Sequence, residues 1–166
     1  MNEDDVDELS RSKATIHLKI NDFSKLKKQK NFRIYSKQYV VRNFGWFIAT
    51  KLDEDEIEKF GFFLHCRSID YGDSNKSIGF PVKVNAKFSV LNRLNPSENL
   101  IQSLKYLYND NNGYGYPSFI EIKKLIDPIN GYYNLENDSI AVELAIQRKD
   151  NIFPKQLLYI SFQTIF

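Results

Sequence analysis

One segment of the chain alternates apolar and polar residues more regularly than any other, and it is the strongest constraint on the fold. Between residues 82 and 90, apolar side chains occupy every second position, and lysine, asparagine and serine occupy the positions between them. Successive side chains of a β-strand point to opposite faces of the sheet. The segment is therefore predicted to be a strand with one buried face and one solvated face.

Other segments repeat this pattern less completely. Residues 16–20 and 140–146 alternate in the same way, and shorter strands are expected at 38–42, 46–51 and 60–66. A tight turn is predicted at residues 43–45, because Gly45 tolerates a positive φ angle. Residues 100–108 fit both a helix, from the spacing of Leu100, Leu104 and Tyr108, and a strand, so the pattern leaves the two open.

A short helix is predicted over residues 117–126. Pro117 suits the first turn of a helix, apolar residues recur at helical spacing, and Asp127 with Pro128 ends the pattern. About seven short strands and one small helix favour an all-β antiparallel sandwich. A parallel α/β fold is disfavoured, since helices do not alternate with strands.

Length and composition indicate one soluble domain. The chain has 166 residues, of which 42% are apolar and 27% charged. No apolar run approaches the roughly 18 residues that would span a membrane, and the net charge of +2 is too small to argue for nucleic acid. Residues 1–10 hold five acids and no base, which predicts a disordered tail and no signal peptide. We expect an intracellular protein of the nucleus or cytoplasm.

The few residues that could support metal or thiol chemistry are poorly placed for it. The chain contains one cysteine, Cys66, and two histidines, His17 and His65, so it has no internal disulfide and too few ligands for structural zinc. His65 and Cys66 are adjacent in a predicted strand and would point to opposite faces. We expect a buried thiol beside a surface histidine, with no cofactor and no metal.

Phe63 is a large aromatic residue predicted to lie on the solvent-facing side of its strand. In the strand predicted at 60–66, Phe62, Leu64 and Cys66 share the core face, so Phe63 falls on the wetter face. A large aromatic side chain there is either covered by a loop or used for binding. The pattern alone leaves both explanations open.

Three segments together resemble a known family. They are Arg11–Thr15 followed by Phe23–Leu26, then Val41–Trp46 (Val-Arg-Asn-Phe-Gly-Trp), then Phe60–Cys66 (Phe-Gly-Phe-Phe-Leu-His-Cys). In order and spacing they resemble the MATH, or TRAF-like, domain, most of all that of ubiquitin-specific proteases of the herpesvirus-associated type. Gly131-Tyr132 and Asn137-Asp138 fit the wider MATH pattern.

The resemblance implies an eight-stranded antiparallel sandwich over residues 11–147, with residues 100–108 as a strand. It implies that residues 148–166 are a C-terminal tail or a truncated linker, and that the chain is not an enzyme. The resembled protease carries its catalytic cysteine in a following domain, and this chain has no cysteine after Cys66. We expect a monomer, because no coiled coil like that of the trimeric TRAF relatives is visible.

Domains of this family capture short extended peptides in a shallow groove on one sheet, in the mode of strand addition. The family's Asp-Trp-Gly-Phe groove segment corresponds here to Gly113-Tyr114-Gly115-Tyr116, and the second Phe of its Gly-Phe-Phe motif to Phe63. Gly115 would let a peptide backbone approach closely, and Tyr114 and Tyr116 would form aromatic walls. Ser118 replaces a family asparagine, and Lys51 loosely replaces a family basic residue. These seven residues are the predicted peptide-binding site.

The predicted partners are peptides with a small residue or proline, two variable residues and a serine, from substrates or regulators in the ubiquitin pathway. Gly113 replaces the family acid that accepts a hydrogen bond from the ligand serine; Asp110 or Asn112 could substitute for it. Losing that bond would cost about 1.5–3 kcal/mol, so micromolar or weaker binding is expected. The alternatives are a substrate adaptor of a cullin-type ubiquitin ligase and, from a different class, a stand-alone hydrolase.

Overall fold

The structure is a computed structural model, and it describes residues 12–29, 31–53, 57–69 and 80–149. The acidic tail predicted at 1–10 and nearly all of the tail predicted at 148–166 lie outside the described residues. None of the helices among the described residues is both long and apolar enough to cross a membrane.

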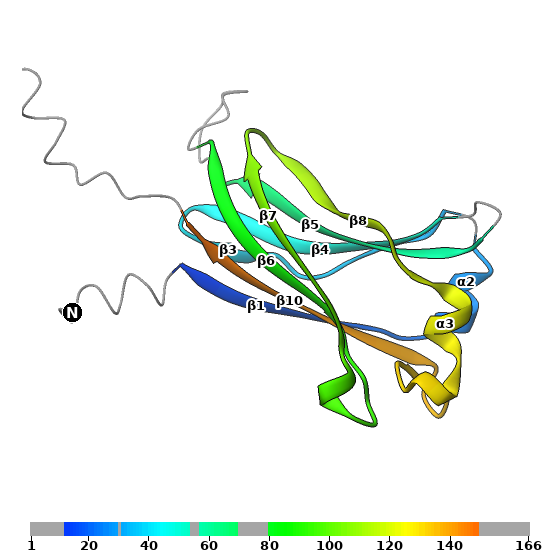
Figure 1. The fold of residues 1–166 in the computed structure, drawn as a ribbon. Coiled ribbons are helices and arrows are strands. Elements are labelled where there is room, and N and C mark those ends of the chain that lie inside the picture. The colour runs from blue at the N-terminus through cyan, green and yellow to red at the C-terminus, as the bar shows by residue number, and fades with distance from the viewer. Residues whose placement is uncertain (1–11, 30, 54–56, 70–79, 150–166) are drawn as a thin grey trace, which may run out of the picture.

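Two antiparallel sheets pack face to face, with the core between them (Figure 1). Sheet A has the strand order β1-β10-β6-β7, with β9 beside β10. Its strands are β1 (Lys13–Ile20), β6 (Val82–Val90), β7 (Leu100–Tyr108), β9 (Tyr133–Asn134) and β10 (Ser139–Arg148). Sheet B has the order β2-β4-β5-β8, with β3 beside β4. Its strands are β2 (Arg33–Tyr35), β3 (Tyr39–Val41), β4 (Phe44–Asp53), β5 (Lys59–Ser68) and β8 (Asn112–Glu121).

The predicted all-β antiparallel sandwich is confirmed, although the described residues contain ten strands rather than eight. Of the strands that were not predicted, β2 and β9 have three and two residues, too few to show an alternation, and β8 has ten. The described residues also contain two short α-helices rather than one. They are α2 (Phe23–Lys27), between the strands predicted at 16–20 and 38–42, and α3 (Ile122–Ile126). Two 3₁₀ turns, η1 (Pro96–Glu98) and η2 (Pro128–Asn130), complete the list.

The alternation that predicted the strands also builds the core. Val82, Val84 and Phe88 of β6 are fully buried, and β6 pairs with β10 on one side and β7 on the other. Sheet B supplies the opposing layer, in which Trp46, Phe60, Phe62 and several other apolar side chains are also fully buried. Aromatic rings meet edge to face across the interior, as in the contact of Phe62 with Phe88 at 4.9 Å.

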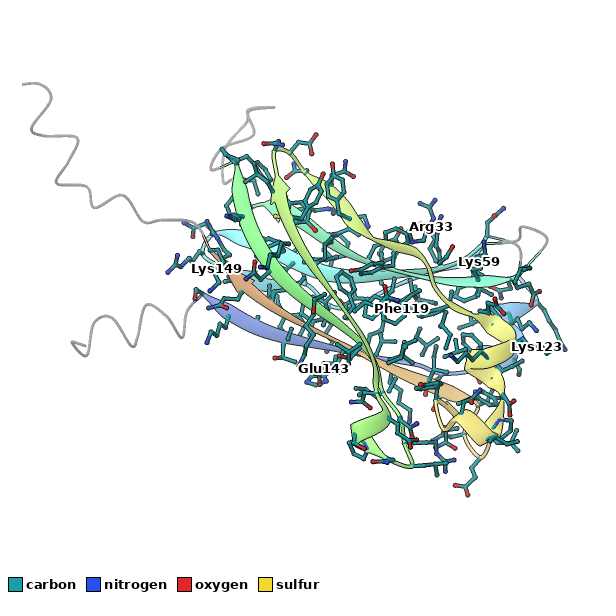
Figure 2. The ribbon with its side chains drawn as sticks, in the orientation of Figure 1. Arg33, Lys59, Phe119, Lys123, Glu143 and Lys149 are labelled. Atoms are coloured by element: carbon teal, nitrogen blue, oxygen red, sulfur yellow. The ribbon has the colours of Figure 1, made fainter. Side chains whose placement is uncertain are left out.

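Residues 100–108 form strand β7, which settles the choice that periodicity had left open. The helix predicted at 117–126 is wrong in its first half, because residues 117–121 continue β8 and only residues 122–126 are helical. Phe60 pairs with Ile120, so the end of β8 gains ladder hydrogen bonds and buries Phe119 and Ile120. In Figure 2, Phe119 points into the space between the sheets.

The turn predicted at residues 43–45 lies one residue earlier. Val41 of β3 pairs with Phe44 of β4, so the two residues between them, Arg42 and Asn43, form the hairpin loop. Both have positive φ angles, 48° and 63°, which is the geometry of a type I′ turn. Gly45 lies inside β4, where a Cβ would collide with the Gln38 side chain (2.5 Å from its Nε2).

Candidate functional site

The outer face of sheet B carries an unusual concentration of aromatic and basic side chains. Cross-strand pairing places Ala49 opposite Phe63 and Phe47 opposite His65, on the face that points away from the core. Residues of the adjoining strands complete this face, which we call the sheet B platform: Arg33, Tyr35, Phe47, Ala49, Lys51, Gly61, Phe63, His65, Arg67, Gly113 and Gly115. Arg33 and Lys59 project from this side of the molecule in Figure 2, and Glu143 projects from the opposite side, on sheet A.

Phe63 lies near the centre of the platform and is half-buried. Its ring is covered in part by Lys51, whose Nζ lies 5.5 Å from the ring centre, a cation–π contact. Phe63 also lines a pocket of about 170 Å³, together with Arg33, Tyr35, Ala49, Thr50, Lys51 and His65. The structure thus places Phe63 and Lys51, two of the seven predicted site residues, side by side at an open depression.

His65 is held in place by rings and backbone on several sides. It stacks on Phe47 with ring centres 5.0 Å apart, and Tyr35 meets it edge-on at 6.4 Å. Arg67 covers the far end of this stack, with Cζ 4.9 Å from the centre of the Phe47 ring. Burial lowers the pKa of His65 below its ordinary value, and the charges of Arg67 and Arg33 lower it further. The imidazole is therefore neutral at pH 7 and can donate one hydrogen bond.

Two glycines of β8 shape the edge of the platform, each for a different reason. At Gly113, a Cβ would collide with the His65 ring, so the missing side chain makes room for the imidazole. At Gly115, a Cβ would collide with the Phe62 carbonyl oxygen and stand 2.7 Å from the Phe63 Cα. The sequence had assigned Gly115 to close approach of a peptide, whereas in the structure the close neighbour is the backbone of β5.

Tyr114 and Tyr116 do not share a face with Phe63. They pair with Leu64 and Phe62, whose side chains are fully buried, so both tyrosines turn toward the interior side of β8. Tyr114 stacks on Tyr106 of β7 at 3.7 Å, and the Tyr116 hydroxyl donates to the Ser103 carbonyl at 2.6 Å. Successive side chains of a strand point to opposite faces of the sheet. The structure therefore corrects the expectation that Tyr114 and Tyr116 line the same groove as Phe63.

The remaining predicted residues lie at the two ends of β8. Ser118 is exposed, in a stretch where β8 has more residues than β5 and the pairing register shifts. Asn112, considered as a substitute for the family acid, accepts from the Gly113 N–H at 2.8 Å and donates to the Tyr114 hydroxyl at 3.4 Å. Its amide is thus engaged within β8 itself.

The most useful property of β8 for binding is its place in the sheet. It is the last strand of sheet B, and among the described residues only β5 pairs with it. Alternate residues of an antiparallel strand direct their N–H and C=O groups to opposite edges. The Gly113 N–H donates to the side chain of Asn112, which indicates that the backbone groups of Gly113 face the outer edge of the sheet. Gly115 lies two residues further along β8, so its backbone groups face the same edge.

Sequence reasoning missed Arg33, Tyr35, Phe47 and Arg67. Phe47 and Arg67 could have been found, because the alternation in their strands places them on the same face as Lys51 and Phe63. Arg33 and Tyr35 lie in the three-residue strand β2, which is too short to show a pattern.

The described residues hold no metal-binding cluster, and His65 and Cys66 do not form a pair. No group of three or more His, Cys, Asp or Glu side chains in the described ranges could hold a metal ion. Cys66 is fully buried, on the face of β5 opposite to His65, so the thiol and the imidazole do not meet. Burial raises the pKa of the Cys66 thiol to about 12, which keeps it protonated and a poor nucleophile.

Comparison with known proteins shows the family to which the chain belongs. Residues 15–146 match the MATH domain, and a search of curated proteins gives no match. MATH domains are protein-interaction domains without catalytic activity of their own. The matched segment covers most of the chain and runs from β1 to β10, through both sheets and the platform. The chain therefore belongs to the MATH domain family.

Proposed function

We propose that this domain captures extended peptide segments of substrates or regulators in the ubiquitin pathway, as the recognition module of an intracellular deubiquitinase. The peptide lies along the outer edge of β8 as an added strand and places alternate side chains on the sheet B platform. The single observation that carries the proposal is the juxtaposition of an edge strand, β8, with the aromatic pocket around Phe63.

Backbone pairing supplies affinity that does not depend on the peptide's sequence. The edge of β8 that faces away from β5 presents the backbone groups of Gly115 and the carbonyl of Gly113, whose N–H already donates to Asn112, and strand addition uses such groups. The two glycines carry no side chains that would shield these groups. The platform beside them supplies the selective contacts.

Side-chain pockets then select among peptides. The Phe63 ring forms an apolar wall, and Tyr35 is 51% exposed, so an incoming side chain can bury both rings further. Burying apolar surface contributes about 25 cal/mol per Å². Binding that combines a short strand and one or two such pockets is expected to be micromolar or weaker.

Isothermal titration calorimetry with a Pro-Ala-Ala-Ser peptide in an extended flanking sequence tests the proposal. Phe63→Ala is expected to weaken binding about tenfold, the effect of losing about 1.4 kcal/mol. Ile101→Ala is the matched control, because Ile101 is 49% exposed and lies on sheet A, away from the platform. Equal effects of the two substitutions would contradict a platform site.

A second peptide set tests the binding mode itself. Methylation of alternate backbone nitrogens removes hydrogen-bond donors without changing side chains, so binding by strand addition must be lost for one set of positions and retained for the other. Binding that is insensitive to every backbone methyl would rule out strand addition. The pathway is tested by cross-linking the domain to proteins in cells and asking whether Phe63→Ala removes ubiquitinated partners.

A further inference from the structure

The outer face of sheet A, on the opposite side of the sandwich from the platform, carries a concentration of positive charge. The alternation that buries one side of each strand turns the lysines of the other side toward solvent. In the five strands that the structure assigns to sheet A, Glu143 is the only Asp or Glu, and its carboxylate lies 3.4 Å from the Nδ1 of His17. The face therefore has an excess of positive charge. Its exposed lysines are Lys13, Lys19, Lys83, Lys87 and Lys105.

Three of these lysines border one hollow, which we call the lysine hollow. It has a volume of about 420 Å³ and lies over the neighbouring strands β1, β10, β6 and β7. Lys13 and Lys105 stand at the two ends of one row of paired residues, with Gln147 and Asn85 between them, and Lys87 belongs to the next row. All five residues line the hollow, and none of the lining residues is an aspartate or a glutamate. An anionic segment lying across the hollow would therefore meet three cations and two amide groups.

The described part of the chain supplies no counter-charge for the lysine hollow. Within the ranges that the structure describes, no carboxylate lies at ion-pair distance from Lys13, Lys87 or Lys105. A single exposed ion pair contributes little to binding, but several charges that act together contribute more. Three cations around one hollow therefore suit a ligand with several negative charges.

The chain contains such a segment directly before β1. Residues 1–10 hold five acids and neither lysine nor arginine. The chain enters sheet A at the end where the hollow lies, because the Ser12 carbonyl accepts a hydrogen bond from the Arg148 N–H at 2.9 Å and Lys13 pairs with Gln147. Opposite charges thus lie close together along the chain. The five acids are Glu3, Asp4, Asp5, Asp7 and Glu8.

The chain between these acids and β1 is long enough to reach the whole hollow. Neighbouring strands are about 4.8 Å apart, so β7, three strand spacings from β1, lies about 14 Å away from it. The chain from Glu8 to Lys13 spans up to about 17 Å when extended. A tether this short gives an effective concentration in the millimolar range, so a weak attraction is enough to populate the contact.

We propose that residues 1–10 dock on the lysine hollow, with their carboxylates beside Lys13, Lys87 and Lys105. The contact is electrostatic, so it weakens as salt screens the charges. The inference does not rest on the proposed function, because the hollow lies on sheet A and the platform on sheet B. An acidic partner that used the hollow would first have to displace this segment.

A nitroxide spin label at position 6 of the full chain tests whether the segment lies on the hollow. Val6 carries no charge and is flanked by the acids, and Cys66 is fully buried, so Val6→Cys directs the label to one position. The amide NMR signals of Lys87 and Lys105 are expected to broaden at low salt. In 1 M NaCl the Debye length falls to about 3 Å, and the broadening is expected to decrease strongly.

Two sets of substitutions in the labelled chain show whether the broadening reports docking or only the tether. The N-terminal set, Asp4→Asn, Asp5→Asn and Asp7→Asn, is expected to remove most of the broadening. The loop set neutralises three acids elsewhere and is expected to leave it unchanged. Each set removes three negative charges, so both change the net charge from +2 to +5. Broadening that neither the N-terminal set nor salt reduces would overturn the proposal. The loop set is Glu54→Gln, Asp55→Asn and Glu56→Gln.

Binding of a fluorescent ten-residue polyglutamate, followed by anisotropy, distinguishes this segment from an acidic partner as the occupant. The segment competes with the probe for the hollow, so the N-terminal set is expected to bind the probe about threefold or more tightly than the loop set. Adding Lys87→Gln with Lys105→Gln to both sets is expected to remove this difference. Adding Lys25→Gln with Lys28→Gln is the matched control, because these two lysines are exposed in and after α2, and is expected to keep the difference.

Equal binding of the probe by the N-terminal set and the loop set overturns docking of the segment. Equal binding that requires Lys87 and Lys105 assigns the hollow to an acidic partner instead, and equal binding that does not require them shows that the hollow takes no anion. None of these results depends on peptide capture by the platform, which is measured separately. Trp46, the single tryptophan and fully buried, reports by its fluorescence that each variant is folded.

Discussion

Gly115 and Phe62, on neighbouring strands of sheet B, lie so close that no side chain fits between them. A Cβ on Gly115 would collide with the Phe62 carbonyl oxygen and stand 3.0 Å from its carbonyl carbon. Both obstacles belong to the backbone of β5, which cannot rotate away as a side chain can. The glycine is therefore required by the sheet itself, whether or not a peptide is bound.

Gly115→Ala is consequently expected to destabilise the fold. Forcing an extra methyl group into a tight space costs about 1–3 kcal/mol, since the strands must move apart and ladder hydrogen bonds lengthen. The measurement is urea unfolding followed by the fluorescence of Trp46. A free energy of unfolding equal to that of the wild type would contradict the close approach.

Gly113→Ala is the matched control on the same strand. Its Cβ would also find an obstacle, but this is the His65 ring, with Cε1 and Nε2 nearest. The ring packs against Phe47 and Tyr35 but can rotate about its own side-chain bonds, as the β5 backbone cannot, so the loss of stability is expected to be smaller than for Gly115→Ala. The displaced imidazole would be visible as a shifted His65 ring signal.

A buried hydrogen bond ties strand β5 to sheet A. Tyr108 of β7 is fully buried, and its hydroxyl donates to the Leu64 carbonyl of β5 at 2.7 Å. Tyr108→Phe leaves a buried carbonyl without this partner and is expected to cost about 1–3 kcal/mol in the free energy of unfolding. Tyr39→Phe, on the exposed strand β3, should change it by less than about 0.5 kcal/mol. A cost for Tyr108→Phe no larger than that control would show that the bond contributes nothing.

Most of the long strands could be predicted from the sequence, because each buries one face in the core and exposes the other to solvent. The alternation of residues 82–90 and 140–146 needs no tertiary information. The same rule placed Phe63 outside and Cys66 inside. It gives no signal for β2 and β9, which have three and two residues. β3 lies within the strand predicted at 38–42, whereas β8, with ten residues, was not predicted as a strand.

The candidate site was predictable only in part, because no strand was predicted over residues 112–121. Adjacent residues cannot share a face, so Tyr114 and Gly115 belong to different surfaces. The helix predicted from Pro117 failed because pairing with β5 outweighs a local preference for the first turn of a helix. Arg33 has no signal in the sequence, since its position follows from the pairing of β2 with β4.

Burial of the single cysteine leads to a prediction about alkaline pH. Burial raises the pKa of the Cys66 thiol to about 12, and the charge of Arg148 only partly opposes this. Above its ordinary pKa of about 9.0 the thiol of the unfolded chain ionises, while the folded thiol stays protonated. The contribution to stability is therefore complete below pH 9 and is lost as the pH rises toward 12.

Two measurements check this behaviour of Cys66. At pH 8, Ellman's reagent is expected to label the folded protein far more slowly than the protein in urea. Cys66→Ala should remove the thiol's share of the alkaline loss of stability, seen as a flatter dependence of the urea midpoint on pH between 9 and 11. Equal labelling rates with and without urea would contradict a buried, protonated thiol.

Asp138, in the turn before β10, carries the last prediction. Its carboxylate accepts hydrogen bonds from the Ser24 N–H and hydroxyl, at 2.9 and 2.6 Å, and from the Tyr133 hydroxyl at 2.7 Å. Hydrogen bonds from Ser24, and then from Tyr133, lower the pKa of Asp138 below its ordinary value. The stability that follows is present above the ordinary pKa, near 3.8, and is lost as the pH falls through the lower folded value.

Asp138→Asn keeps a residue that tolerates the positive φ of 49° but loses the charged acceptor that joins α2 to the turn. We expect a lower melting temperature than the wild type at pH 7, and a difference that shrinks in acid as the wild-type carboxylate becomes protonated. Glu136→Gln, an exposed acid in the same turn region, controls for the loss of one negative charge. A difference between Asp138→Asn and the wild type that stays constant from pH 7 to pH 2 would show that the ionised carboxylate does not hold the turn.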